Sequence, residues 1–414
     1  MTLKTPLRWI TLAVATTGLA LAGCNGGGSS SGGSTTGSTT GSTTGSTTGG
    51  STTGGTTGGS TGGLTGGLTG GGSGALGSLF VSLDAGGEQG SVDTYAADLS
   101  ARTASFNTGL NEGIFLNNGQ LTAVGLIGNL GTIRRFPNFA TRGTGAYDTA
   151  QDDEFMFTTI KAPHGATFAG LGGNALIVAD APAAVMGETL SQVPSIHFLT
   201  STLSLTQPLL LYTLPVSVAQ GRTWDVAYDG IADRLYAAMT NGVINVYDTF
   251  GTRALTASLG GPAVSPSRTI TPGTINGGNS AKISVNLHGI EFNRASNQLV
   301  VSDVGSPSSD SDGSLYVIDN ASTASDSVAG TGPAVVVPSR VITGAGTLLG
   351  NPVDVLLRSD GKLYVAEKAN GGGQILVFNG ILTGTTSGNL APDQHVTTGS
   401  LGSTGTPESI AEAN

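Results

Sequence analysis

The sequence predicts an all-β protein, a six-bladed β-propeller built from four-stranded antiparallel blades. Three observations lead to this fold class. Short runs of β-branched and aromatic residues alternate with turn residues throughout the C-terminal three quarters of the chain. These runs recur in groups of four, and the last run of the chain completes the first group.

The clearest group runs from His288 to Thr343, with apolar runs at 288–292, 299–303, 315–319 and 339–343. The following group has runs at 353–357, 363–366, 375–378 and 394–397, and the preceding one at 224–228, 235–238, 243–247 and 268–271. The fourth runs agree closely, with Pro-Ser-Arg-Thr-Ile-Thr from Pro266 and Pro-Ser-Arg-Val-Ile-Thr from Pro338. Repetition at this period predicts an array, because a lone four-stranded unit cannot bury both of its faces.

The N-terminal groups are less regular. The second blade is expected at 112–116, 121–126, 132–136 and 155–160, and the third at 165–170, 175–180, 195–199 and 209–214. The first blade lacks its first strand, having runs only at 79–83, 91–95 and 103–106, and we expect the run at 407–411 to supply it. Such closure joins the two ends of a propeller and removes two sheet edges. A seventh blade within 143–161 is an alternative that the length of this stretch disfavours.

The first residues predict export. Lys4 and Arg8 precede an apolar run from Trp9 to Ala22 that is too short to span a bilayer, so residues 1–23 are predicted to be a signal peptide. The following Cys24 is the only cysteine, and Leu-Ala-Gly-Cys resembles the lipobox of bacterial lipoproteins, which implies an acylated protein anchored to the outer membrane or cell surface. An ordinary cleaved signal followed by an unused cysteine is the alternative.

The remaining chain divides in two by composition. Residues 24–76 are almost wholly Gly, Ser and Thr after the cysteine, which predicts a disordered tether, and residues 77–414 hold the propeller repeats. Without Lys4 and Arg8, 15 of the 17 basic residues remain against 27 acidic ones, a net charge of −12. A phosphate backbone would be repelled, so nucleic acid is excluded as a principal partner.

Candidate site residues come from aligning the six first strands, which line the central channel of a propeller. One equivalent position, which we call the channel ring, holds Glu408, Glu112, His164, Trp224, His288 and Val353 in blade order. We expect His164, His288, Glu112 and Glu408 to be able to hold one divalent metal ion, with Trp224 as an apolar wall. The first expectation for these positions is nonetheless a polar lining of a wet channel, and the metal site is the second. In the next layer of the channel, Asp225 and Asp354 are the acidic candidates.

The runs Gly-Ile-Glu-Phe-Asn after His288, Leu-Val-Val-Ser-Asp ending at Asp303 and Leu-Tyr-Val-Ile-Asp ending at Asp319 resemble the NHL-type repeat, and more broadly the six-bladed gluconolactonase-like propellers. This resemblance implies either a binding scaffold or a metal-dependent hydrolase or lyase. The chain has no Gly-x-Ser-x-Gly, phosphate-loop or His-Glu-x-x-His motif. A binding module of the cell envelope for a protein, glycan or small molecule is therefore the first expectation. A metal-dependent lactonase or lyase is the second, and a structural component of the envelope the third.

Overall fold

The computed structural model describes residues 77–86, 90–117, 119–169, 175–182, 193–200, 208–217, 221–306, 309–328, 330–385 and 387–413. The predictions for the signal peptide, Cys24 and the tether lie outside these residues. Within them, no helix has both the length and the apolar character needed to cross a bilayer.

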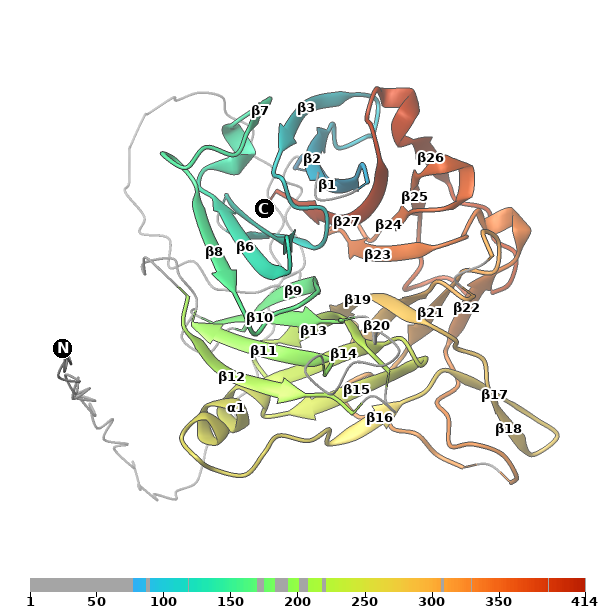
Figure 1. Ribbon diagram of the computed structural model, residues 1–414. Coiled ribbons are helices and arrows are strands. Elements are labelled where there is room, and N and C mark those ends of the chain that lie inside the picture. Colours follow the sequence, from blue (N-terminus) through green and yellow to red (C-terminus); the bar gives the residue numbers. More distant parts are fainter. Residues whose placement is uncertain are drawn as a thin grey trace, which may run out of the picture. The chain divides into compact units, whose positions relative to one another are not determined.

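The described part of the chain is a six-bladed β-propeller, in which six four-stranded antiparallel sheets stand in a ring (Figure 1). Each blade runs from its inner strand outward, and a short strand, β7 (Gly145–Ala146), extends the outer edge of blade 1 in parallel. Blade 1 comprises β27 (Thr406–Glu412), β1 (Leu79–Asp84), β2 (Gly90–Tyr95) and β3 (Arg102–Asn107). Blade 2 comprises β4 (Ile114–Asn117), β5 (Gln120–Ile127), β6 (Leu130–Phe136) and β8 (Asp153–Phe157). Blade 3 comprises β9 (Pro163–Ala169), β10 (Ala175–Asp180), β11 (Ser195–Thr200) and β12 (Leu210–Pro215). Blade 4 comprises β13 (Thr223–Asp229), β14 (Arg234–Met239), β15 (Val243–Asp248) and β16 (Arg268–Ile270). Blade 5 comprises β19 (Leu287–Asn293), β20 (Gln298–Asp303), β21 (Ser314–Ile318) and β22 (Arg340–Thr343). Blade 6 comprises β23 (Pro352–Leu357), β24 (Leu363–Glu367), β25 (Gln374–Phe378) and β26 (Gln394–Thr397).

The C-terminal strand closes the ring, as the sequence predicts. β27 pairs antiparallel with β1, so that Leu79 lies opposite Glu412 and Ser82 opposite Ser409. In Figure 1 the red β27 lies beside the blue β1. The stretch 143–161 contains no further blade, because its strands β7 and β8 join the edges of blades 1 and 2.

The apolar core lies between the blades. Six clusters of buried side chains occur, one at each junction between neighbouring blades, including the junction of blade 6 with blade 1. At that closing junction Val81 and Ile410 of blade 1 pack with Tyr364 and Ile375 of blade 6. Since each sheet buries both faces against its neighbours, the repeat has a physical basis in the packing.

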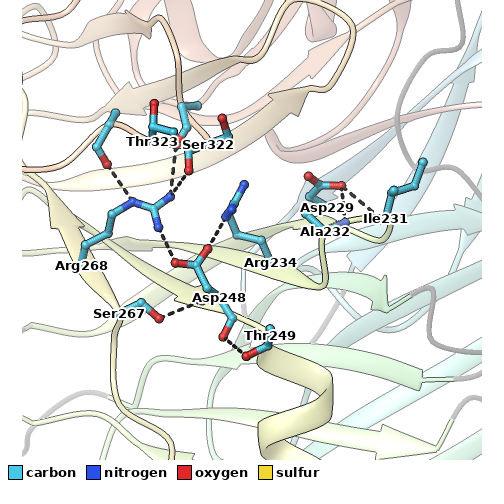
Figure 2. Close-up of polar contacts among 12 residues, drawn as sticks. Asp229, Ile231, Ala232, Arg234, Asp248, Thr249, Ser267, Arg268, Ser322 and Thr323 are labelled. Atoms are coloured by element: carbon cyan, nitrogen blue, oxygen red, sulfur yellow. Dashed lines mark hydrogen bonds and ion pairs between the residues drawn. The ribbon is translucent and has the colours of Figure 1, made fainter.

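The closely matching fourth runs of blades 4 and 5 link each blade to the next. Arg268 donates from Nε to the carbonyl of Ala324 at 2.8 Å and from Nη2 to that of Ser322 at 2.8 Å, while Asp248 of its own blade holds the guanidinium at 2.5 Å (Figure 2). Arg340 donates in the same way to the carbonyls of Leu382 and Gly384 in blade 6. These bonds explain why the arginine of the fourth run recurs.

Elements outside the repeat were not predicted from the sequence. Helix α1 (Phe250–Ser258) connects β15 to β16, and the hairpin β17 (Gly273–Asn276) and β18 (Asn279–Lys282) connects blade 4 to blade 5. Short 3-10 turns occupy Phe139–Thr141, Ala345–Thr347, Asn370–Gly372 and Thr398–Leu401. The carboxylate of Asp233 accepts the backbone N–H groups of Gly251 and Thr252, at 2.7 and 3.0 Å, and so caps the start of α1.

Candidate binding site at the channel ring

An irregularity of the inner strands sets the position of the channel ring. In blade 4, Thr223 pairs with Met239 and Asp225 with Ala238, so Trp224 has no partner of its own in β14. The same register shift falls at the ring residues of blades 1, 3, 5 and 6, which are Glu408, His164, His288 and Val353. A β-bulge of this kind redirects one side chain out of the alternation of the strand, and bulges are frequent beside functional sites.

A second device fixes the backbone two residues before the ring. The acidic residue that ends the second strand accepts the N–H of that position in three blades: Asp180 from Ala162 at 2.6 Å, Asp303 from Asn286 at 2.8 Å and Glu367 from Asn351 at 2.8 Å. In blade 4 the hydroxyl of Thr240 takes this role and accepts from the N–H of Arg222 at 2.9 Å. These carboxylates are therefore committed to holding the backbone in place.

Three ring residues form a continuous aromatic stack. The ring of Trp224 lies 3.8 Å from that of His164 on one side and 3.8 Å from that of His288 on the other, with interplanar angles of 19° and 18°. Because imidazoles cover both sides of the indole, Trp224 offers no free face on which a ligand could stack. The stack spans blades 3, 4 and 5.

His164 is also held by a carboxylate. Its Nδ1 lies 2.7 Å from Oε2 of Glu112, which stands two residues before β4 in blade 2. Burial acts to raise the pKa of Glu112, but the charge and hydrogen bond of His164 outweigh it and lower that pKa. Both side chains keep part of their surface accessible. A carboxylate on Nδ1 orients the imidazole and leaves Nε2 available for proton transfer.

Glu408 is engaged elsewhere. Its carboxylate forms an ion pair with Lys368, which is also 3.3 Å from the carboxylate of Asp84. Among the described residues no group of three or more His, Cys, Asp or Glu side chains is arranged to hold a metal ion. The structure thus distributes the four proposed ligands over a His164–Glu112 pair, a Glu408–Lys368 pair and His288, and the metal assignment stays a prediction.

His288 is buried without polar partners. The residue is 6 % exposed, and neither ring nitrogen makes a hydrogen bond to another described residue. Burial lowers the pKa of His288 well below its usual range, and nearby His164, Arg222 and Lys368 lower it further, so the His288 imidazole is neutral. Leaving such a buried polar group without a partner costs about 1–3 kcal/mol of folding stability.

The next layer of the channel is acidic, as expected from Asp225 and Asp354. Asp225 accepts from the N–H of Ile290 at 3.1 Å, and Asp354 accepts from the hydroxyl of Ser409 at 2.7 Å. Both carboxylates thereby connect neighbouring inner strands. Burial raises the pKa of Asp354 to about 6, and burial together with Asp354 raises the pKa of Asp225 well above its usual range.

Glycines keep this layer narrow. A Cβ at Gly289 would lie 2.5 Å from the Cα of Asp354, and one at Gly165 would overlap the carboxylate of Asp225. Glu291, also on β19, carries a third carboxylate, and burial followed by the charge of Asp354 raises its pKa to about 8. The sequence alignment did not single out Glu291, since it examined only two positions of each inner strand.

Arg222 and Lys368 were also missed. Arg222 stands two residues before the ring in blade 4, where its guanidinium carbon lies 5.4 Å from the centre of the Trp224 ring. Lys368 follows Glu367 at the end of β24 and reaches the ring from the second strand of blade 6. An alignment that included the position two residues before the ring and the residue after the second strand would have found Arg222 and Lys368.

Comparisons with known proteins give a fold and no family. No protein-family model matches the sequence, and no curated protein matches it either. Among solved structures, the periplasmic gluconolactonase of Pseudomonas aeruginosa superposes with a TM-score of 0.53 at 13 % identity, covering 82 % of this chain and 99 % of that one.

Two further structures resemble the chain more loosely. A Bacteroides uniformis protein proposed to be a 6-phosphogluconolactonase has a TM-score of 0.47 at 10 % identity, over 78 % of this chain and 81 % of that one. The β-propeller domain of Cps50 from Myceliophteria thermophila has a TM-score of 0.42 at 12 % identity, over 78 % and 87 %. The likeness to the Pseudomonas structure is one of fold, and the chain is a β-propeller.

Proposed function

We propose that this protein is a lipid-anchored component of the cell envelope whose propeller binds a small polar ligand at the channel ring. The observation that carries the proposal is His288, a buried imidazole that the fold leaves without partners beside a rigid stack of aromatic rings. Binding sites are built from a few polar groups fixed on rigid elements, and polar groups that cost stability in the folded state are typical of functional positions.

Three buried carboxylates near the ring differ from His288 in this respect. Asp180, Asp303 and Glu367 satisfy backbone N–H groups and have an evident structural use. His164, Trp224 and His288 make contacts with one another and with Glu112, but they satisfy no backbone group. A purely structural lining would not need this combination of side chains.

Intrinsic fluorescence tests the proposal. The sequence has two tryptophans, Trp9 and Trp224, and Trp9 lies in the predicted signal peptide, so Trp224 is the sole tryptophan of the lipoprotein that begins at Cys24 and places the reporter in the site. The lipoprotein in detergent should show a saturable fluorescence change and a raised Tm with at least one member of a panel of sugars, sugar acids and lactones. His164→Ala and His288→Ala should each weaken that response, whereas His395→Ala, an exposed histidine on β26, should not.

The opposite pattern would remove the proposal. It would consist of no response to any member of the panel, or of a response that survives in both ring variants.

A lactone hydrolase is the second candidate, favoured by the Glu112–His164 pair. With Nδ1 held by the carboxylate, Nε2 of His164 can take a proton from water as the water oxygen attacks the lactone carbonyl. The acyl–oxygen bond then breaks, and the ring oxygen leaves as a hydroxyl after receiving that proton. The activity named for the Pseudomonas neighbour makes glucono-1,5-lactone the first substrate to try.

The hydrolase candidate predicts acid release above the spontaneous rate in a pH-stat. General base catalysis contributes about 10²- to 10⁴-fold, so His164→Ala should lower the rate by that order while His395→Ala leaves it unchanged. The divalent ion predicted from the sequence is tested in the same preparations. An ion at a hundredfold excess over its Kd should add about 2.7 kcal/mol of stability, and the double variant His164→Ala, His288→Ala should abolish the increment.

A further inference from the structure

Arg222 occupies a backbone position that the fold defines in several blades. The equivalent residues two before the ring are Ala162, Asn286 and Asn351, none of them charged, and each is held through its N–H by the end of the second strand. In blade 4 the same bond is made by Thr240, and the carbonyl of Arg222 in turn accepts from the N–H of Thr240 at 2.9 Å. The backbone that carries this guanidinium is therefore fixed on both sides.

The guanidinium itself has no polar partner in the described part of the chain. Every other arginine there makes a side-chain hydrogen bond or ion pair: Arg102, Arg134, Arg135, Arg142, Arg234, Arg253, Arg268, Arg294, Arg340 and Arg358. Arg222 is half-buried, and its one described side-chain contact is with the Trp224 ring. A guanidinium stays charged in proteins and carries five donors, so one that is removed from water without acceptors is unfavourable.

The carboxylates at the ring already have other partners. At the ring, Glu112 is paired with His164, and Glu408 is paired with Lys368. His288, the nearest ring residue on the other side of Trp224, is neutral and brings no negative charge. Unlike Lys368, Arg222 therefore has no acidic partner among the described residues, in a chain whose net charge is −10.

We propose that Arg222 anchors the oxyanion, a carboxylate or a phosphate, of the small ligand bound at the channel ring. This inference rests on the proposed function and names its ligand class. A planar guanidinium binds either oxyanion through two parallel hydrogen bonds, which are stronger than bonds between neutral groups. The accessible part of His164 lies in the same stack and can serve the polar remainder of the ligand.

The test uses the lipoprotein in detergent, in which Trp224 is the sole tryptophan, with three probes of similar size. D-gluconate carries a carboxylate, D-glucose 6-phosphate carries a phosphate, and D-glucose is neutral. We expect saturable changes of Trp224 fluorescence with at least one of the two anions, and at least tenfold weaker binding of D-glucose. Arg222→Met should lower the affinity for the anion at least tenfold, to the affinity for D-glucose.

Two further variants control the result. Arg253→Met removes a guanidinium that bonds the Ser265 carbonyl at 2.8 Å next to helix α1, and it should leave binding unchanged. Arg222→Lys keeps the charge without the planar fork, so its affinity should lie between wild type and Arg222→Met. Because it preserves charge and most of the side-chain volume, this variant also keeps the test decisive if Arg222→Met fails to fold.

The binding measurements identify the anion and test the role of Arg222. Binding of gluconate alone assigns a carboxylate, and binding of glucose 6-phosphate alone assigns a phosphate. Equal binding of D-glucose and the anions, unchanged in Arg222→Met, overturns the role of Arg222 while the fluorescence response leaves the binding function standing. No response to any of the three probes overturns the oxyanion assignment, and the wider ligand panel then decides the proposed function separately.

Discussion

Replacing Arg358 by Met should loosen the closure of the ring. Arg358 follows β23 of blade 6 and is fully buried, with 0 % of its surface exposed. Its Nη2 donates to Oε1 of Glu412 at 2.6 Å and to the carbonyl of Gly77 at 2.8 Å, and its Nη1 donates to the carbonyl of Ala97 at 3.2 Å. One side chain thus holds both ends of blade 1 from the neighbouring blade.

The expected magnitude follows from these contacts. Met has a similar length but no donors, so the carboxylate of Glu412 loses its cation and two carbonyls lose their partners. Removing one member of a buried ion pair costs roughly 3–5 kcal/mol. At about 2.1 cal/mol/K per residue, the roughly 340 residues of the propeller have an unfolding entropy of about 0.7 kcal/mol/K, so 1 kcal/mol corresponds to about 1.4 °C and Tm should fall by on the order of 4–7 °C.

The matched control is Lys362→Met on the same hairpin. Lys362 pairs with Asp360 at 3.3 Å, but its side chain is 40 % exposed, and a surface pair of this kind contributes about 0–1 kcal/mol. Urea and thermal unfolding of the two variants should therefore differ clearly. Adding Glu412→Gln to Arg358→Met should recover part of the loss, because the buried uncompensated charge is then gone. Equal stability of Arg358→Met and Lys362→Met would refute the reasoning.

Three other predictions concern the acidic channel, the closing strand and the anchor. Because burial raises the pKa of Glu291 to about 8, this group favours folding below its unfolded pKa near 4.5 and loses that contribution as pH rises through 8. In urea unfolding, Glu291→Gln should be as stable as wild type at pH 4.5 and more stable at pH 9, by at most about 5 kcal/mol at 1.4 kcal/mol per pKa unit. Equal urea midpoints of the two proteins at pH 9 would contradict the raised pKa. Deleting Thr406 to Asn414 should lower Tm far more than deleting Asn25 to Ala75, since only the first deletion removes the inner strand of blade 1; similar Tm values would speak against ring closure as the source of stability. Cys24→Ser should move the protein from the detergent phase to the aqueous phase in phase partition, and a wild-type protein already in the aqueous phase would exclude lipidation.

The fold was predictable because the repeat is expressed in local patterns. Alternating runs and turn residues predicted the six blades, and the missing first strand near Leu79 together with the spare run near Ile410 predicted the closure. Helix α1 and the hairpin β17–β18 escaped because they lie between repeats. The Gly277–Gly278 pair, which forms the two-residue turn between Asn276 and Asn279, is nevertheless a hairpin signal that could have revealed the second of these.

The site was predictable in position more than in chemistry. Aligning the inner strands placed His164, Trp224 and His288 at equivalent positions, and the bulges explain why these residues share one level of the channel. The partners of the acidic residues were not predictable. Lys368 reaches Glu408 from a different strand, and a pairing between side chains 40 residues apart leaves no periodic signal in the sequence.

The closing strand also determines when the protein can finish folding. Chains fold from the N-terminus as they are made, yet β1 waits for β27, whose residue Glu412 pairs with Leu79 from the far end of the chain. Until the last residues are released, β1 exposes an unpaired edge that can pair with another chain. The final docking must bring together segments separated by nearly the whole propeller, which makes it an intrinsically slow step. A chain interrupted shortly before Thr406 would therefore keep an open, association-prone edge at β1.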